Sequence, residues 1–293
     1  MIEAQMQSGD KSADMQRPVL RHIANLWTLQ QHPSREREWT LREKLSAIRD
    51  AGFDGVCWAP SQELCETAQE IGLVFVGGMA SRQKEEFGAM LRDLKAGGAH
   101  HVNVQLGNDK MDATTALDMT LSLMHEGESL GLLPAIEFHR GTCVDTPEKS
   151  YALADAYEQA TGRLLRISWD FSHFAVVKHL LPWQFAEWLL VRPKLVQYAQ
   201  QFHFRPFNGH HVQTPITTGD GRLTQEVQDW LPFAEAVLRC WLADAGNSRR
   251  EIFVCPELGP VQEGYALSGF PPSWEDAKVL RAEVDQLWKT VTG

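Results

Sequence analysis

The segment Leu164-Leu165-Arg166-Ile167-Ser168-Trp169-Asp170-Phe171-Ser172-His173 contains the pattern on which the fold prediction rests. Residues 164–169 form a short, largely apolar run that is typical of a buried strand. The run ends at Asp170, and His173 follows three residues later. Asp170 therefore lies where the predicted strand ends and a loop begins, and residues at such positions often have catalytic or binding roles.

Three further apolar runs end in the same way. Glu137, His203 and Glu257 each follow directly after such a run. Carboxylates and imidazoles are ligands that divalent metal ions take in proteins. The four strand ends together therefore indicate a metal site.

Short apolar runs alternate with longer amphipathic stretches from Val19 onward. The runs predicted as strands are residues 22–27, 53–59, 73–77, 101–106, 132–138, 164–169, 198–204 and 251–255. The stretches predicted as helices are residues 40–51, 60–72, 82–96, 112–130, 146–162, 182–191, 226–245 and 273–290. Thr40 with Glu43 forms a capping box, Thr146-Pro147 is a typical helix start, and Gly77-Gly78 predicts a turn.

Regular alternation of this kind implies parallel strands joined by helical crossovers. Eight such units favour a single-domain (β/α)8 barrel, or TIM barrel, over residues 18–293, with the active site at the carboxyl ends of the strands. An open doubly wound sheet is the competing architecture, but residues 26–30 (LWTLQ) are not the glycine-rich turn that it requires. Residues 1–17 are polar and are predicted to be a disordered tail.

Composition narrows the class of protein. The chain of 293 residues has a net charge of −10, which argues against a nucleic-acid partner. Its five cysteines form no CxxC pair, which favours a reducing cytoplasm. No apolar run reaches the roughly 18 residues that span a bilayer, so we expect no membrane partner. A homo-oligomer is compatible with the sequence, but no feature selects its size.

In a barrel, the strands that end at Glu137, Asp170, His203 and Glu257 are consecutive, so their side chains are expected to converge. Three carboxylates this close raise one another's pKa unless a cation lies between them. Three oxygens and one nitrogen suit one divalent ion, Mn, Mg, Co or Zn. The alternative is that each acid caps a helix or pairs with an arginine.

Candidate substrate contacts lie near the predicted strand ends, in the fourth predicted strand and on the loop after the seventh. They are His173, His139, Arg205, His211, Asn103 and Trp58. We expect His173 on the loop after Asp170, facing the barrel mouth. Asn103 should point into the barrel and bind hydroxyls or satisfy another polar group. Trp58 is expected to stack on a sugar ring or to pack in the core.

The motifs EFH at Glu137, WDFSH from Trp169 to His173, FHF at His203 and PELG at Glu257 resemble the xylose isomerase-like TIM barrel superfamily. The branch to which the chain is most similar is the sugar phosphate isomerase/epimerase group, which includes ketose 3-epimerases and hydroxypyruvate isomerase. The resemblance covers roughly residues 19–290.

The resemblance implies a metal ion held by the four residues at the strand ends. It also implies that Glu137 and Glu257 are the catalytic proton-transfer pair and that His173 contacts the substrate. Epimerases of this type carry a substrate-binding arginine further past the metal histidine than Arg205, which comes two residues after His203. The lysine of two-metal hydride-shift isomerases has no clear counterpart, which favours proton transfer.

The leading functional prediction is a divalent-metal-dependent isomerase or epimerase of a sugar or sugar phosphate, working by proton transfer through an enediolate. One alternative is a metal-dependent dehydratase or lyase acting on a keto-sugar or inositol derivative. Another is a non-catalytic, metal-dependent sugar-binding protein. Endonuclease IV has a related barrel, but its three-metal cluster needs several more histidines, and the acidic charge is wrong for DNA.

Overall fold

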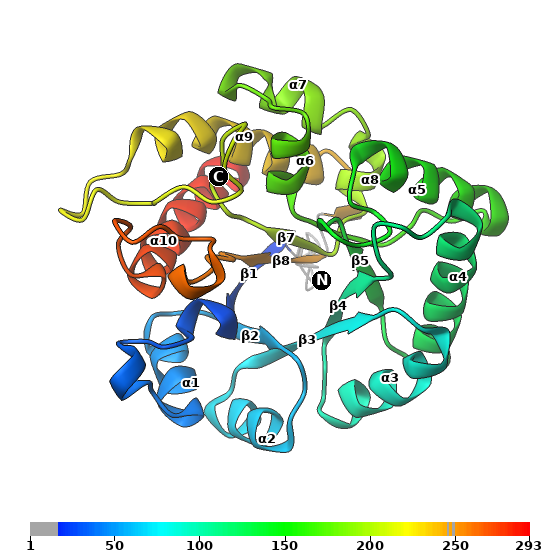
Figure 1. Cartoon of the computed structure of the whole chain (residues 1–293), viewed down its shortest axis with the longest axis horizontal. Coiled ribbons are helices and arrows are strands. Elements are labelled where there is room, and N and C mark those ends of the chain that lie inside the picture. Colours follow the sequence, from blue (N-terminus) through cyan, green and yellow to red (C-terminus); the bar gives the residue numbers. More distant parts are fainter. Residues whose placement is uncertain (1–16, 245, 248–249) are drawn as a thin grey trace, which may run out of the picture.

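The computed structural model describes residues 17–244, 246–247 and 250–293. The predicted tail, residues 1–17, lies outside the described residues except for Arg17. Figure 1 shows a ring of strands surrounded by helices, with the last helix returning beside the first strands. None of the described helices is long and apolar enough to cross a membrane.

Eight parallel strands close into a barrel in which each strand pairs with the next and β8 pairs with β1. The strands are β1 (Val19–Asn25), β2 (Gly55–Trp58), β3 (Val74–Ser81), β4 (His101–Leu106), β5 (Pro134–Glu137), β6 (Ile167–Trp169), β7 (Gln201–His203) and β8 (Glu251–Cys255). The predicted (β/α)8 barrel is therefore confirmed, and the open doubly wound sheet is excluded.

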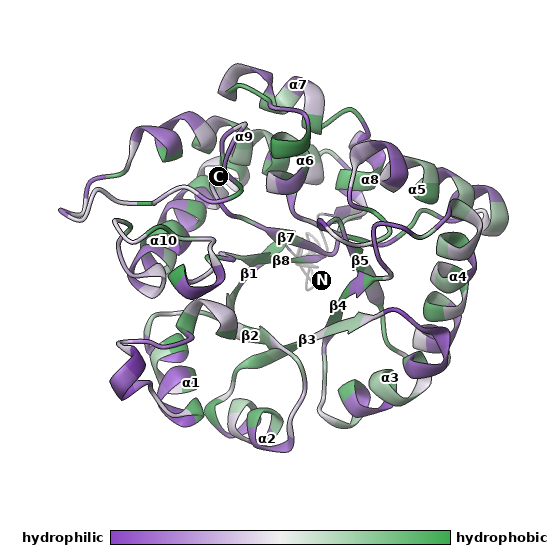
Figure 2. Cartoon of the chain, viewed as in Figure 1, coloured by the Kyte–Doolittle hydropathy of each residue, from purple (hydrophilic) through white to green (hydrophobic). Residues whose placement is uncertain are grey.

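Helices cover the outside of the barrel. They are α1 (Leu41–Asp50), α2 (Gln62–Ile71), α3 (Phe87–Ala96), α4 (Ala113–Ser129), α5 (Pro147–Thr161), α6 (Phe171–Val177), α7 (Phe185–Leu189), α8 (Pro193–Gln197), α9 (Gln225–Leu242) and α10 (Ser273–Thr292). Hydrophobic and hydrophilic residues alternate along them in Figure 2. In α9, for example, Val227, Trp230 and Ala234 are buried at helical spacing, so one face packs on the barrel.

The predicted helix starts at Thr40 and Thr146 are confirmed. The Thr40 hydroxyl accepts a hydrogen bond from the Glu43 amide, and the Glu43 carboxylate accepts one from the Thr40 amide. Thr146 accepts from the amide of Lys149, with Pro147 in the first helical position. These caps satisfy amides that have no partner within the helix.

The prediction of a turn at Gly77-Gly78 is wrong, because both glycines lie inside β3. A Cβ atom on Gly77 would lie 2.2 Å from Cδ2 of Leu94, so the missing side chain lets α3 pack against the strand. Gly78 belongs to the lining of the cavity at the barrel mouth. A Cβ atom on Gly78 would lie 3.3 Å from the backbone carbonyl carbon of Trp58, so both glycines mark close packing rather than a change of direction.

Several element boundaries also differ from the predictions. The first strand begins at Val19 instead of His22, and it ends earlier than predicted because Asn25 accepts a hydrogen bond from the Trp27 amide and starts a 3-10 helix, η1 (Leu26–Leu29). Between β6 and β7 the single predicted helix is replaced by α6, α7 and α8. The first of these begins directly after Asp170, whose side chain caps it by accepting from the Ser172 amide at 2.9 Å.

The barrel interior changes from apolar to polar along its axis. An apolar layer fills the interior on one side, formed by Ile23, Cys57, Val76, Phe253 and Cys255. Beyond it, toward the carboxyl ends of the strands, lie the polar residues of the candidate site. Side chains thus fill the centre of the barrel, and among the described residues the cavity next to the candidate site lies at the carboxyl ends of the strands.

His22 on β1 should make the fold sensitive to mild acid. Its side chain is buried, and burial, reinforced by the charge of Arg281, lowers its pKa to about 4. The His22 side chain therefore binds a proton near pH 6.5 in the unfolded chain but only near pH 4 in the folded chain. Because the unfolded state binds more protons between these values, the free energy of unfolding falls as the pH drops from about 6.5 toward 4. We expect this group alone to contribute a loss of about 2 kcal/mol between pH 7.5 and pH 5.

Urea unfolding of the wild-type protein and of His22→Asn at both pH values measures this contribution. The pH-dependent loss of unfolding free energy should be smaller in the variant by about 2 kcal/mol. His125→Asn is the matched control, because His125 is exposed on α4 and should leave the loss unchanged. An equal loss in His22→Asn and wild type would contradict the prediction.

Candidate metal centre

The four residues predicted at the strand ends converge on one point. Ligand atoms of Glu137, Asp170, His203 and Glu257 all lie within 4.8 Å of one another. Glu137 and His203 are the last residues of β5 and β7, whereas Asp170 and Glu257 follow β6 and β8. All four side chains are buried, with exposures from 0% to 7%. The convergence follows from four consecutive parallel strands that end at the same rim.

Each carboxylate uses one oxygen for a hydrogen bond that fixes its orientation. Glu137 Oε2 accepts from Asn103 Nδ2 at 2.7 Å and from Gln105 Nε2 at 3.1 Å. Glu257 Oε1 accepts from Asn25 Nδ2 at 3.1 Å. Asp170 Oδ1 accepts from the amide and hydroxyl of Ser172.

The second oxygen of each carboxylate faces a positively charged or titratable partner. Nδ1 of His203 lies 3.2 Å from both Glu137 Oε1 and Glu257 Oε2. Asp170 Oδ2 pairs with Arg205 and lies 3.3 Å from Nε2 of His173. Neutral donors thus hold one oxygen of each carboxylate. The other oxygens of Glu137 and Glu257 face His203, whereas that of Asp170 is already paired with Arg205.

The His203 ring is held by the residue two positions before it on β7. The Gln201 amide nitrogen lies 2.7 Å from Nε2 of His203, and an amide group can donate to or accept from this nitrogen. Nδ1 is thereby turned toward the carboxylates. Burial alone lowers the pKa of His203, but Glu257 and Glu137 outweigh burial and raise it well above its usual value.

Glu137 and Asp170 remain ionised despite their burial. Burial alone raises the pKa of Glu137, but His203 more than offsets it and the pKa is lowered. The pKa of Asp170 is likewise held well below its usual range, because Arg205 and His173 outweigh the effect of burial. These two residues therefore present carboxylates and not carboxylic acids at neutral pH.

Arg205 contributes a positive charge to this cluster. Its guanidinium is buried, pairs with Asp170 and lies 3.7 Å from Glu257 Oε2. The three carboxylates and this guanidinium leave a net charge of −2 when His203 is neutral. A divalent cation would neutralise that charge, whereas a monovalent one would leave a buried excess.

The donor set fits such a cation. Glu137 Oε1 and His203 Nδ1 are buried atoms that have no hydrogen-bond partner among the described residues, since their contact at 3.2 Å lacks hydrogen-bond geometry. Buried polar atoms are normally paired. Three carboxylate oxygens and one imidazole nitrogen match the preferences of Mg, Mn, Co or Zn. The buried Glu-Asp-His-Glu cluster can therefore hold a metal ion.

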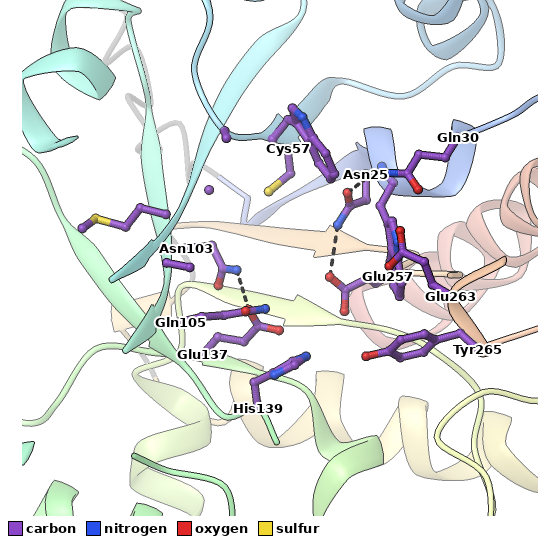
Figure 3. A pocket seen from close by; sticks show the side chains of 16 residues that line it. Asn25, Gln30, Cys57, Asn103, Gln105, Glu137, His139, Glu257, Glu263 and Tyr265 are labelled. Carbon is purple, nitrogen blue, oxygen red and sulfur yellow. Dashed lines mark hydrogen bonds between the residues drawn. The ribbon is translucent and has the colours of Figure 1, made fainter. Parts of the chain in front are cut away.

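A cavity of about 420 Å³ opens beside the cluster at the barrel mouth, as Figure 3 shows. Glu137 and Glu257 border both the cluster and the cavity. The rest of the lining combines amides, aromatic rings and small residues: Asn25, Trp27, Gln30, Cys57, Trp58, Ala59, Gly78, Met79, Ala80, Asn103, Gln105, His139, Glu263 and Tyr265. A carbohydrate-sized molecule fits such a space.

The residues predicted to contact a substrate fall into two groups. Asn103, His139 and Trp58 line the cavity, although Asn103 also donates to Glu137. Arg205 and His211 lie outside its lining, the former beside Asp170 and the latter exposed with its amide donating to Asn208.

His173 belongs to the second group. The prediction that it lies on a loop is wrong, because α6 begins immediately after Asp170 and includes it. Its side chain is buried and packs edge-on against His139, with 4.3 Å between ring centroids. It therefore contacts a ligand of the cluster and a residue of the cavity wall, but does not itself border the cavity.

Several cavity residues were not identified from the sequence. Asn25 is the last residue of β1. The sequence prediction extended this strand to residue 27, so Asn25 was not recognised as a strand-end residue. Glu263 and Tyr265 lie on the long segment between β8 and α10, which shows no periodic pattern. The ring of Tyr265 lies edge-on to Trp27 at 4.5 Å and is flanked by Arg140 and Arg205. It thus forms one wall of the mouth.

No protein-family model matches the sequence, and no curated protein matches it. Solved structures do match. A D-psicose 3-epimerase studied in the presence of D-fructose has a TM-score of 0.57 and 12% identity, covering 92% of this chain and 99% of its own. A xylose isomerase-like TIM barrel protein from Mycobacterium smegmatis, in complex with magnesium, has a TM-score of 0.55 and 13% identity, covering 94% and 98%.

A third similar structure is a probable 3-DHS dehydratase from Bacillus anthracis, with a TM-score of 0.52 and 11% identity, covering 89% of this chain and 98% of its own. At these identities the similarity establishes the fold alone. The chain has the fold of the xylose isomerase-like TIM barrel proteins, as its motifs predicted.

The cluster should bind about one equivalent of a divalent ion, and Glu137→Gln should weaken binding. The substitution keeps the shape of the side chain but removes one of three negative charges, so we expect the affinity to fall at least roughly 100-fold, the upper range for loss of a supporting partner. Elemental analysis and calorimetric titration with Mn²⁺ measure both quantities.

Glu187→Gln on α7 is the matched control, because Glu187 is exposed and distant from the cluster in sequence and fold. If the wild-type protein takes up none of Mn, Mg, Co or Zn, the cluster is an ion-pair network closed by His203 and Arg205, and the metal assignment is wrong.

Proposed function

We propose that the protein is an enzyme, a divalent-metal-dependent isomerase or epimerase of a small carbohydrate. The observation that carries the proposal is the position of Glu137 and Glu257. Both carboxylates belong to the candidate metal cluster, and both border the cavity from different strands. A substrate in the cavity would therefore border two bases that also belong to the candidate metal cluster.

A divalent ion held by Glu137, Asp170, His203 and Glu257 would polarise a substrate carbonyl and acidify the neighbouring carbon-bound proton. One of the two glutamates removes that proton and leaves an enediolate. For epimerisation, the other glutamate would first take up a proton from solvent and deliver it to the opposite face, and the first glutamate would then release its proton to solvent. For isomerisation, the protonated first glutamate would deliver its proton to the adjacent carbon, while the hydroxyl proton moves to the former carbonyl oxygen. Asn25, Asn103 and Gln105 hold the two bases in position throughout.

A metal-dependent dehydratase or lyase is the second candidate, supported by the fold shared with a probable dehydratase. The first step would be the same proton removal. The resulting carbanion would then expel a β-hydroxyl group as water instead of being reprotonated. The mass of the product separates the two reactions, since isomerisation conserves it and dehydration removes one water.

The state of the cysteines supports a proposal for the cellular location of the protein. All five are free, and three of them, Cys57, Cys143 and Cys255, are buried. Free thiols persist in a reducing compartment. We propose a cytoplasmic location and a small-molecule carbohydrate as the binding partner.

Solvent deuterium should enter the substrate in the presence of the metal-loaded protein, and Glu257→Gln should slow that exchange. Loss of a positioned general base costs typically 10²–10⁴-fold in rate, so we expect a decrease of at least about 100-fold. Ketoses, aldoses and keto-sugar derivatives are incubated in D₂O with Mn²⁺ and followed by NMR and mass spectrometry, with Glu187→Gln as control.

An equal exchange rate in Glu257→Gln and wild type would exclude Glu257 as a base. Ligand-induced stabilisation without any deuterium exchange or loss of water would instead identify a non-catalytic sugar-binding protein.

A further inference from the structure

Glu263 places a negative charge in the cavity outside the metal cluster. It is the last residue of a 3-10 helix, η6 (Val261–Glu263), on the segment between β8 and α10. Its side chain lines the cavity beside Glu257 and Tyr265, as Figure 3 shows. Among the described residues no lysine, arginine or histidine lies within the 4.0 Å of an ion pair with it.

The charges of the metal cluster would be balanced once a divalent ion is bound. Glu137, Asp170 and Glu257 carry three negative charges, and Arg205 together with the ion would supply three positive ones. No lysine or arginine lines the cavity. The guanidinium of Arg205 is directed to Asp170 and lies over the ring of Tyr265, 5.2 Å from its centroid. Glu263, whose side chain is exposed, is therefore the carboxylate of the lining that stands outside this balance.

The remaining lining suits an uncharged, hydroxylated molecule. Asn25, Gln30, Asn103 and Gln105 offer amide donors and acceptors to hydroxyl groups. Trp27, Trp58 and Tyr265 offer aromatic surface to the apolar C–H face of a sugar. None of these groups compensates a phosphate or a carboxylate on the ligand.

Two exposed arginines belong to a neighbouring cavity. Arg82 and Arg140 line that space, which shares Ala80, Gln105 and His139 with the main cavity. Arg140 lies over Tyr265, 4.5 Å from the ring centroid. Neither arginine belongs to the lining of the main cavity.

We propose that Glu263 is a specificity-determining residue that restricts this cavity to uncharged carbohydrates and disfavours phosphorylated ones. The inference rests on the proposed function of the same site. Its physical basis is the repulsion of an anionic ligand by the Glu263 carboxylate in a cavity whose lining contains no lysine or arginine, since like-charge contacts suppress wrong partners.

Binding of matched neutral and phosphorylated sugars tests the inference. The probes are D-fructose with D-fructose 6-phosphate, and D-xylulose with D-xylulose 5-phosphate, each titrated calorimetrically into the Mn²⁺-loaded protein. We expect the wild type to bind the neutral sugar at least about 10-fold more tightly. This ratio should fall at least about 10-fold in Glu263→Lys, and less in Glu263→Gln, mainly through tighter binding of the phosphorylated probe.

Glu187→Lys is the matched control, because it makes the same change of net charge on α7 and should leave the ratio unchanged. The inference is overturned if the wild type binds the phosphorylated probes as tightly as the neutral ones, if it binds no neutral sugar, or if the ratio is the same in Glu263→Lys.

Solvent deuterium exchange, measured on the same samples, separates this result from the proposed function. Selective binding of the neutral sugar without exchange of its carbon-bound protons supports the role of Glu263 and contradicts the isomerase assignment. Exchange that proceeds equally well on the phosphorylated sugars supports the isomerase assignment and overturns the role of Glu263.

Discussion

The burial of three carboxylates at one rim of the barrel is the constraint on which the rest of the site depends. Glu137, Asp170 and Glu257 are almost inaccessible to water, and their mutual repulsion has to be compensated locally. Arg205 compensates one charge permanently through Asp170. His203 lies between the other two acids and is replaced as a source of positive charge when a divalent ion binds its Nδ1.

A second layer of neutral donors makes this arrangement rigid. Asn25, Asn103, Gln105 and Ser172 each hold one carboxylate oxygen, so the orientation of the acids does not depend on the cation. Because these donors come from β1, β4 and the start of α6, the cluster is supported from several sides of the barrel. Such preorganisation favours both metal binding and a proton transfer that requires little rearrangement.

Much of this could be predicted from the sequence, for identifiable reasons. Apolar runs that end in Glu137, Asp170 and His203 are local patterns, and the closure of consecutive strands brings them together without further information. The role of Gly77-Gly78 could not be predicted, because it depends on the approach of Leu94 from α3. The wall formed by Glu263 and Tyr265 could not be predicted either, since that segment has no periodicity and is positioned by tertiary contacts.

The apolar layer inside the barrel has a consequence for how this protein can evolve. Ile23, Val76 and Phe253 stabilise the interior without bordering the cavity, whereas Trp27 and Glu263 border the cavity and lie outside the strands. On the proposed function, mutations at the second group would alter ligand preference at little cost to folding, because they leave the packed interior intact. Descendants of this sequence could then acquire new ligands through changes at the rim while inheriting the same scaffold and the same buried cluster.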